Sequence, residues 1–422
     1  MRPLPVPGPF AFRTARQILF GPGESRRAAE IAASLGRRVL LVTGARSLER
    51  SGGLAGISAA VSDRGAAVVR WVVPTEPDVA LVDAGAAASR EAGCDAVLAV
   101  GGGSVIDAGK AIAALATNPG PALDYLEEVG AGRVLTRVPL PVVAVPTTAG
   151  SGSETTRNSV LRVPEASVKR SLRSDLILPA WAVVDPELSA TAPPAVAAAA
   201  GLDALTHLIE SYTSTGAHAM SDALALPGIR LAAAGLHALA AAATGGAGRA
   251  ADGGTPGSAP AAGERALASL WGGITLANAG LGAVHGLAAP LGGTARVAHG
   301  VACACLLPHT LVVNVEALRR RRPASPALAR YRDVLGIVSP HDPTPEGAAA
   351  TLEDLRRRLG VPSLGAVGLK RAELEGVVEG SRGGSMRSNP IELTDAELTS
   401  ILDAALHADS DAGTPAGQGI LS

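Results

Sequence analysis

The chain has 422 residues, of which 47% are hydrophobic, so it is long enough to form two domains that each bury a core. Its formal net charge of −1 at pH 7 excludes the large excess of basic residues that binds nucleic acids or anionic membrane surfaces. Aromatic residues make up only 2% of the chain, and Leu, Val and Ile must therefore supply most of the core volume.

The first half of the chain alternates strand patterns with helical patterns. Residues 1–9 hold several prolines and no apolar segment typical of a signal peptide. Residues 10–20 alternate apolar and polar side chains, which predicts paired strands that end at Gly21. The following segments predict helices at 24–35 and 79–92 and strands at 38–43, 67–73, 96–100 and 141–145. This alternation is typical of a parallel sheet in an α/β domain.

A glycine cluster follows the strand at 96–100 and begins the next helix. At Gly101, Gly102 and Gly103 the backbone could approach a pyrophosphate, and the helix N-terminus offers free N–H groups and a positive dipole end. The pattern is neither G-x-G-x-x-G nor a Walker A loop, so a plain tight turn is the alternative interpretation. A second loop, at 146–154, carries hydroxyls and glycines suited to ribose, phosphate or nicotinamide, with a Ser/Thr-rich cap as its alternative. The candidate cofactor-binding residues of the two loops are Gly101, Gly102, Gly103, Ser104, Asp107, Thr147, Thr148, Ser151 and Ser153.

The pattern changes near Pro193, where long Ala- and Leu-rich helical segments replace the strands. We place the domain boundary near Leu188, and expect an α/β domain at 1–188 and an all-α domain at 189–422. Within the second domain, the Gly-, Ala-, Pro- and Ser-rich residues 245–263 predict a flexible insert, and 409–422 predict a disordered tail. No uninterrupted apolar run of membrane-spanning length stands out.

Four polar residues in the second domain suggest a metal site. Asp203 and His207 are spaced i, i+4, which on a helix places both side chains on one face, within reach of one ion. His285 and His299, on later segments, could complete a cage of four ligands. Three imidazoles and one carboxylate suit a divalent transition metal such as iron or zinc. An ordinary buried pair or a helix cap is the alternative interpretation of Asp203 and His207.

The three cysteines, Cys94, Cys303 and Cys305, form no disulfide framework, which favours a reduced, cytoplasmic protein. Cys303 and Cys305 are separated by one residue and so lack the C-x-x-C spacing of redox and zinc sites.

Taken in order, these motifs resemble those of the iron-containing (group III) alcohol dehydrogenase family. The resemblance covers roughly residues 10–405 and includes GLDALTHLIE at 201–210, PTTAGSGSE at 146–154, DPEL at 185–188 and CLLPH at 305–309. It implies a metal-dependent, NAD(P)-linked oxidoreductase that transfers a hydride between nicotinamide and a small alcohol or aldehyde. It also implies that the catalytic metal, Fe²⁺ in the first place and Zn²⁺ in the second, is bound by Asp203, His207, His285 and His299.

The resemblance has further consequences for single residues. It implies a cleft between the two domains, with Lys169 and Leu188 close to the nucleotide and His309 in a structural role. The chain departs from the family pattern at Ala289, where a second histidine is usual four residues after the third ligand, and at Ala298, where proline is usual. These departures leave the proton route and the substrate open.

The residue after the strand at 38–43 bears on the choice between NAD and NADP. A carboxylate there accepts a hydrogen bond from the ribose 2′-OH and repels a 2′-phosphate, and many members of the resembled family have Asp at this point. This chain has Gly44 instead, with Arg46 two residues later. We therefore expect NADP(H) to be favoured over NAD(H).

Other activities remain open at this point. Arg157, Arg170 and Arg173 place cations near the cleft segments, which would suit an acidic substrate and a maleylacetate-reductase-like keto-acid reductase. A dehydroquinate-synthase-like lyase would share the fold, the NAD and the metal, but its ligand set is Glu-His-His. We expect a homodimer that acts on a small molecule and has no nucleic-acid or membrane partner.

Overall fold

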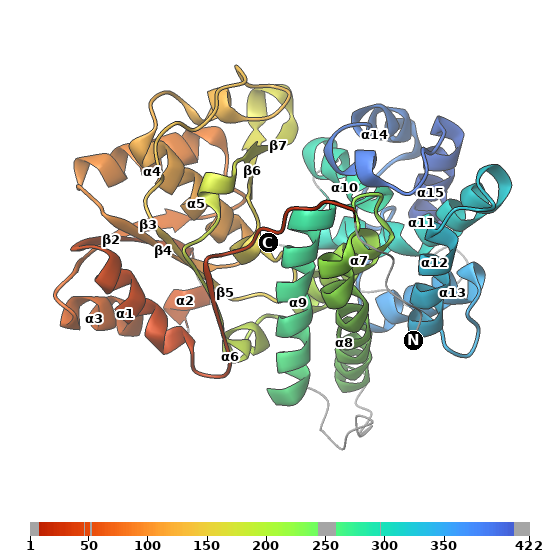
Figure 1. Ribbon diagram of the computed structural model, residues 1–422, viewed down its shortest axis with the longest axis horizontal. Helices are drawn as coiled ribbons and strands as arrows, with labels where there is room; N and C mark the ends of the chain where they lie inside the picture. The colour runs from red at the N-terminus through yellow and green to blue at the C-terminus, as the bar shows by residue number, and fades with distance from the viewer. Residues whose placement is uncertain (1–7, 46, 51–52, 244–258, 296, 409–422) are drawn as a thin grey trace.

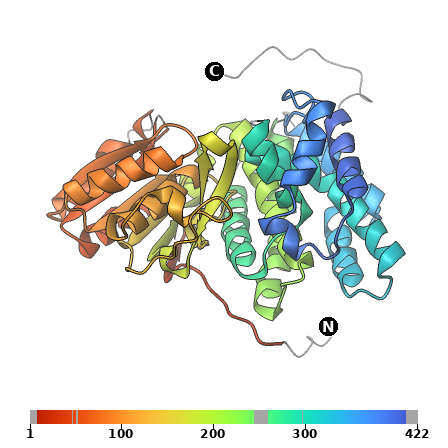
Figure 2. The same cartoon turned by 90° about the horizontal axis from the view of Figure 1, so that it is seen from above.

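The computed structural model describes residues 8–45, 47–50, 53–243, 259–295 and 297–408. Figures 1 and 2 show an α/β body, coloured red to yellow, beside a helical body, coloured green to blue. The fold class expected from the sequence is therefore confirmed. The predicted tail at 409–422 and the cofactor candidate Arg46 lie outside the described residues.

The first body is built on a six-stranded parallel sheet with the order β1-β8-β5-β4-β2-β3. Its strands are β1 (Gln17–Phe20), β2 (Arg38–Gly44), β3 (Ala67–Val73), β4 (Ala96–Gly101), β5 (Val142–Pro146) and β8 (Trp181–Val184). Its helices are α1 (Ser25–Leu35), α2 (Ser47–Arg50), α3 (Gly53–Asp63), α4 (Val79–Glu91), α5 (Gly103–Thr117) and α6 (Pro186–Ala190).

The strands bury both faces because successive side chains point to opposite sides of the sheet. In β2, Val39 and Leu41 join the apolar cluster under α1 and α3, whereas Leu40 and Val42 join the cluster under α4 and α5. All four side chains are inaccessible to solvent. A continuous apolar strand thus specifies a sheet that is covered by helices on both faces.

The expectation of paired strands over residues 10–20 is wrong. Only β1 forms, and it pairs in parallel with β8 at the edge of the sheet. The preceding residues instead contact the helical body: Arg13 exchanges hydrogen bonds with Asn278, and the Phe10 ring stacks on His218. The alternating pattern therefore reflects packing against helices as well as strand formation.

A two-stranded antiparallel sheet, which the sequence did not reveal, projects from the first body. It consists of β6 (Asn158–Val163) and β7 (Val168–Arg173). Short 3₁₀ helices complete the chain: η1 (Ala122–Tyr125), η2 (Ser153–Thr155), η3 (Pro164–Ala166), η4 (Asp175–Ile177), η5 (Arg371–Glu373) and η6 (Gly384–Ser388). The β6–β7 sheet reaches the second body, where β7 packs against α10.

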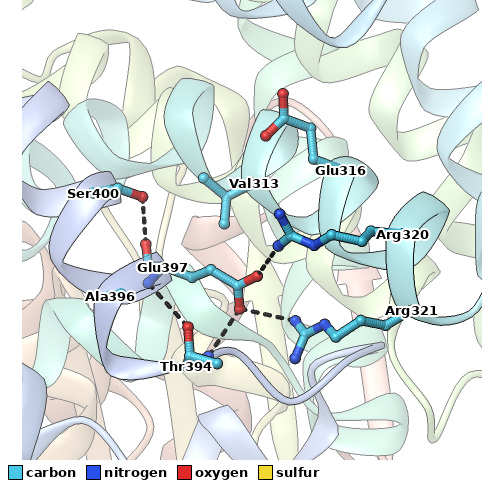
Figure 3. Close-up of a pocket in the computed structure, with 8 residues that line it drawn as sticks. All are labelled: Val313, Glu316, Arg320, Arg321, Thr394, Ala396, Glu397 and Ser400. Carbon is cyan, nitrogen blue, oxygen red and sulfur yellow. Dashed lines mark hydrogen bonds and ion pairs between the residues drawn. The ribbon is translucent and has the colours of Figure 1, made fainter.

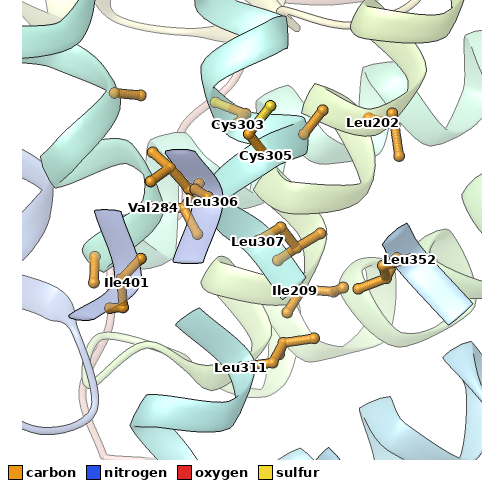
Figure 4. Close-up of a cluster of buried hydrophobic side chains, with 14 of the residues drawn as sticks. Leu202, Ile209, Val284, Cys303, Cys305, Leu306, Leu307, Leu311, Leu352 and Ile401 are labelled. Atoms are coloured by element: carbon orange, nitrogen blue, oxygen red, sulfur yellow. The ribbon is translucent and has the colours of Figure 1, made fainter. Parts of the chain in front are cut away.

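In the second body, α7 packs against α8, α9 and α11, and α11 also packs against α10, α12, α13 and α15. Its helices are α7 (Pro194–Thr213), α8 (Ala219–Ala243), α9 (Ala259–Ala279), α10 (Ala283–Thr294), α11 (His299–Arg321), α12 (Ala327–Val338), α13 (Pro345–Arg358), α14 (Leu374–Gly380) and α15 (Asp395–His407). Figure 4 shows the core between α7 and α11, where Ile209 lies near Leu307 and Leu311. Residues 259–263, which we expected in the insert, belong to α9, and residues 245–258 lie outside the described part.

Among the described helices, α8 and α11 are long and apolar enough to cross a membrane by length and composition alone, although Pro227 interrupts the apolar run of α8 and Pro308 that of α11. Both pack against other helices of the second body, and 72% of the most apolar stretch of α11 is buried there. Burial inside a helical domain accounts for the apolar character of α11.

The two bodies meet where the loop after β5 approaches α7 and α9. A Cβ added to Gly150 would lie 2.7 Å from the Cα of Ala200, and one added to Gly152 would collide with the backbone of Gly273. Gly152 also has a positive φ of 61°, which favours glycine. These close approaches hold the loop at 147–153 against α9 and against α7, which carries the predicted ligands Asp203 and His207.

Candidate active site

Helix α7 positions the first two predicted ligands. It begins with Pro194, whose fixed φ suits the first turn of a helix, and its later turns are buried among neighbouring helices. Asp203 and His207 lie one turn apart on this helix and are only 5% and 4% exposed. Their side chains face each other, with 3.7 Å between Asp203 Oδ1 and His207 Nε2.

Helices α10 and α11 supply the other two predicted residues. His285 Nε2 lies 3.4 Å from Asp203 Oδ1, and His299 Nε2 lies 3.6 Å from the same oxygen. The His207 and His285 rings stack with centroids 4.6 Å apart. The side chain of His299 is 45% exposed, so this histidine marks the side of the cluster that faces solvent. The structure thus brings together all four residues that the sequence suggested as metal ligands.

The donor set fits a divalent cation. Asp203 Oδ1 is buried, yet it makes no hydrogen bond within the described residues, because the three imidazole nitrogens lie beyond good hydrogen-bonding distance or alignment. A buried carboxylate oxygen without a partner is costly, and a cation held between it and neutral imidazoles would satisfy it.

Burial and the neighbouring charges set the protonation states of Asp203 and His207. Burial raises the pKa of Asp203, but His207, His299 and His285 outweigh this effect, and the pKa falls well below its ordinary value. Burial lowers the pKa of His207 to about 3, although Asp203 acts in the opposite direction. Asp203 is therefore ionised and His207 neutral, which are the protonation states in which these side chains bind a metal.

Glu210, close to one further turn along α7 from His207, holds His285 in place and was not identified from the sequence. His285 Nδ1 lies 2.6 Å from Glu210 Oε2, and the backbone N–H of Val284 donates to Glu210 Oε1 at 2.7 Å. A carboxylate that accepts the Nδ1–H leaves the Nε2 lone pair of His285 directed toward Asp203, as metal-binding histidines require.

Cys303 was also missed. Its Sγ lies 3.7 Å from both His285 Nε2 and His299 Nε2. Asp203, His285, His299 and Cys303 each offer one ligand atom, and these four atoms all lie within 4.8 Å of one another. The sequence does contain the signal, since Cys303 follows His299 by four residues and both therefore lie on one helix face.

The two predicted cofactor loops lie next to each other at the carboxyl ends of β4 and β5. Gly101 is paired with Pro146 in the sheet, and its carbonyl accepts a hydrogen bond from Thr147 N at 2.9 Å. A Cβ added to Gly103 would lie 2.7 Å from Ser151 Oγ, so only glycine fits here without a shift. Gly102 caps the N-terminus of α5. The strand order reverses between β2 and β4, and ligands of open α/β sheets bind at such a point.

The other loop candidates divide into two groups. Ser104, Thr147, Thr148 and Ser151 are partly exposed around the glycine cluster, where a ligand could reach them. The carboxylate of Asp107, in contrast, accepts hydrogen bonds from Ser153 Oγ and Val160 N and pairs with Lys110.

Lys110 is fully buried and connects α5 to the second loop. Its Nζ donates to the Ser153 carbonyl at 2.9 Å and to Thr156 Oγ1 at 3.0 Å. Contacts among Asp107, Ser153 and Lys110 thus connect the glycine cluster at 101–103 with the second loop at 146–154.

Gly44 and Leu188 are both partly buried in the first body. Gly44 ends β2 beside β4, and a Cβ added to it would make an ordinary contact of 3.8 Å with Val105. Leu188, on α6, packs against the apolar cluster under α1.

The predicted cations near the cleft are paired. Lys169 Nζ lies 2.6 Å from Glu76 and next to α10, where a Cβ added to Gly292 would approach it to 2.8 Å. The three arginines are also paired with carboxylates: Arg157 with Asp175, Arg170 with Glu128 and Arg173 with Glu127. His309, which we expected to be structural, lies 3.5 Å from Glu353.

A separate hollow of about 520 Å³ lies between α11 and α15 (Figure 3). Its two arginines, Arg320 and Arg321, both pair with Glu397, at 2.6 and 2.8 Å. With Glu316, which also lines the hollow, the two positive and two negative charges there balance, and no predicted site residue lines it.

Two family models together match most of the chain. The family described as "Iron-containing alcohol dehydrogenase" matches residues 15–186, and "Fe-containing alcohol dehydrogenase family, C-terminal" matches residues 197–406. Long-chain-alcohol dehydrogenase 1 of Geobacillus thermodenitrificans is 34% identical over 340 residues, which cover 79% of this chain and 80% of the relative.

Solved structures show the same likeness over nearly the whole chain. A 1,3-propanediol oxidoreductase has a TM-score of 0.82 and 32% identity, with 94% of this chain and 100% of the other covered. A sulfoacetaldehyde reductase from Bifidobacterium kashiwanohense, in complex with NAD⁺, has a TM-score of 0.79 and 27% identity, with 94% and 99% covered. With both of its domains matched in order, the chain belongs to the iron-containing alcohol dehydrogenase family of oxidoreductases, which act on small alcohols and aldehydes.

Proposed function

We propose that the chain is a metal-dependent, NADP(H)-preferring alcohol dehydrogenase or aldehyde reductase whose metal ligands include Asp203, His207, His285 and His299. The observation that carries this proposal is Asp203 Oδ1, a buried oxygen without a hydrogen bond that faces three imidazole nitrogens at 3.4 to 3.7 Å. The donor set suits Fe²⁺ in the first place and Zn²⁺ in the second.

Each part of the site has a role in hydride transfer. A bound divalent ion would act as a Lewis acid that polarises the alcohol or carbonyl oxygen, while the nicotinamide carries the hydride. Asp203 and the neutral imidazoles would hold that ion, and Glu210 orients the His285 ring. Solvent reaches the cluster on the side of His299, which is the side where substrate would approach.

The nucleotide would lie on the glycine cluster. The Gly101–Gly103 backbone and the N-terminus of α5 would receive the pyrophosphate, with Ser104, Thr147, Thr148 and Ser151 around it. We propose that Lys169 and Leu188 border this site, and that Asp107 and Ser153 support it through the Lys110 network.

The preference for NADP(H) is inferred from Gly44. This residue ends β2 next to the strand-order reversal, where a carboxylate would repel a 2′-phosphate, and glycine has no side chain to do so. A ribose 2′-phosphate therefore meets no opposing charge from residue 44.

The proposed substrate is a small alcohol or aldehyde. A keto acid, the alternative that we considered from the sequence, would need a free cation, but Arg157, Arg170 and Arg173 each pair with a carboxylate. We further propose a cytoplasmic homodimer, with a nucleotide-binding domain at 1–188 and a metal-binding domain at 189–422. Analytical ultracentrifugation of the purified protein tests the dimer directly.

Metal analysis followed by a kinetic panel tests the proposal. Purified protein should contain about one divalent metal ion per chain, lose activity on chelation and recover it when Fe²⁺ or Zn²⁺ is restored. NADPH oxidation with aldehydes should exceed both NADH oxidation and turnover of keto acids. Full activity of the metal-free protein would overturn the metal centre, and a tenfold preference for NADH, equal to about 1.4 kcal/mol, would overturn the cofactor assignment.

A further inference from the structure

We propose that Cys303 is an additional ligand of this metal centre, so that the chain binds its metal through sulfur as well as through nitrogen and oxygen. This inference rests on the proposed function, because it concerns the same metal ion. Cys303 lies on α11, one turn after His299, and its side chain is fully buried (Figure 4).

The distances between the ligand atoms match a metal coordination shell. Tetrahedral zinc sites have Zn–N and Zn–S distances that place nitrogen or oxygen ligands about 3.3 Å apart, and sulfur about 3.6 Å from nitrogen. Asp203 Oδ1 lies 3.4 Å from His285 Nε2 and 3.6 Å from His299 Nε2. Cys303 Sγ lies 3.7 Å from each of the same two nitrogens. One ion could therefore contact these four atoms, and His207 Nε2, 3.7 Å from Asp203 Oδ1, would be its fifth ligand.

Hydrogen bonds of the Cys303 thiol would satisfy the two imidazole nitrogens but leave Asp203 Oδ1 without a partner. The thiol can donate to one of these nitrogens and accept from the N–H of the other, each at 3.7 Å. The unsatisfied oxygen of Asp203 in the same cluster independently indicates a place for a cation. A metal ion satisfies the sulfur, both nitrogens and the oxygen at once.

Cys305 shows that the position of a thiol on α11 decides whether it lies at the metal site. Cys305 is also buried on α11, but its thiol donates to the Pro362 carbonyl at 3.2 Å. The two thiols therefore have different partners although only one residue separates them. Cys305 is a matched control for any thiol-specific measurement at Cys303.

Ligation by Cys303 has a defined proton balance. The S–H bond breaks, the sulfur–metal bond forms, the proton leaves to solvent, and neither the sulfur nor the metal changes oxidation state. Because thiolates are soft ligands, this sulfur should shift the preference of the site from Fe²⁺ toward Zn²⁺.

Cobalt substitution provides a direct spectroscopic test. A thiolate bound to Co²⁺ produces an intense near-ultraviolet charge-transfer band, which oxygen and nitrogen ligands do not produce. We expect this band in Co²⁺-loaded wild type and in Cys305→Ser, and its loss in Cys303→Ser and Cys303→Ala. We also expect Zn²⁺ affinity, measured by competition with a chelating dye, to fall at least tenfold in both Cys303 variants, with unchanged far-ultraviolet circular dichroism.

The outcomes separate this inference from the proposed function. If wild type binds one Co²⁺ and shows visible ligand-field bands without the charge-transfer band, the metal centre stands and Cys303 is not a ligand. A charge-transfer band that survives in both Cys303 variants would likewise overturn the assignment. If wild type binds neither Co²⁺ nor Zn²⁺, the metal centre itself is refuted, and the Cys303 assignment with it.

Discussion

Replacement of Glu210 by glutamine tests whether the site depends on the orientation of His285. In the native chain, Glu210 accepts hydrogen bonds from His285 Nδ1 at 2.6 Å and from Val284 N at 2.7 Å. A glutamine has the same shape, but it can accept with only one of its two terminal atoms. If its oxygen keeps the bond from Val284 N, its NH₂ group faces His285 Nδ1 and favours the tautomer with hydrogen on Nε2.

The wrong tautomer directs an N–H group of His285 at Asp203, where a metal needs a lone pair. If the correct tautomer is restored, a hydrogen of the introduced amide opposes the Nδ1 hydrogen of His285, at a place where both side chains are buried. Loss of such partners of metal-binding histidines typically lowers metal affinity 10- to 100-fold. We therefore expect Zn²⁺ to bind Glu210→Gln with about 1.4 to 2.7 kcal/mol less free energy.

The assay is competition between the protein and a chelating dye for Zn²⁺, at one pH and salt concentration. The control is Glu353→Gln, which removes one charge from another Glu–His contact of the helical body, where His309 Nε2 lies 3.5 Å from Glu353 Oε1. We expect the control to bind Zn²⁺ like wild type. Unchanged Zn²⁺ affinity in a folded Glu210→Gln protein, or an equal loss in Glu353→Gln, would refute the role given to Glu210.

Two further predictions concern stability and proton transfer. Burial raises the pKa of the Glu154 carboxyl from 4.5 to about 7. The contribution of this carboxyl to the free energy of unfolding is therefore fully present below pH 4.5 and is lost as the pH rises through 7. We therefore expect thermal unfolding to show that Glu154→Gln has a higher free energy of unfolding than wild type, by a margin that grows from pH 5 to pH 8 and approaches ~3 kcal/mol. A margin that stays constant over this pH range would contradict the raised pKa. Ala289 is exposed on α10, one turn after His285, so Ala289→His should leave metal content unchanged, alter the pH profile of alcohol oxidation between about pH 6 and 8, and impair the largest substrates most. Loss of metal from this variant would mean that the position crowds the ligands, and no change in either property would mean that residue 289 faces away from the chemistry.

Much of the fold could be predicted because its signals are local. In β2, the unbroken run from Val39 to Val42 indicates a strand buried on both faces, since neighbouring side chains point in opposite directions. The i, i+4 spacing of Asp203 and His207 needs only a helix to bring both side chains to one face. The glycine cluster after β4 depends on a strand followed directly by a helix, which the sequence pattern also indicates.

Other signals were ambiguous because the same local pattern suits different surroundings. Residues 10–20 have the alternation of a hairpin, yet only Gln17–Phe20 finds a strand partner, and Arg13 is bound by Asn278, far away in the sequence. Asp107 follows the glycine cluster as a nucleotide ligand might, but the β6–β7 sheet and Lys110 occupy its carboxylate. Tertiary contacts, which local patterns do not encode, decided both cases.

The metal cluster likewise combines features that local sequence shows with contacts that only the folded chain creates. The sequence by itself determined which residues could bind a metal, because carboxylate and imidazole chemistry is a property of each side chain. Only the tertiary structure decided that Glu210 meets His285, 75 residues later, and that Cys303 lies equally far from two histidines on different helices. Such contacts require α7, α10 and α11 to pack at particular angles and depths, which depend on how all their apolar faces fit together.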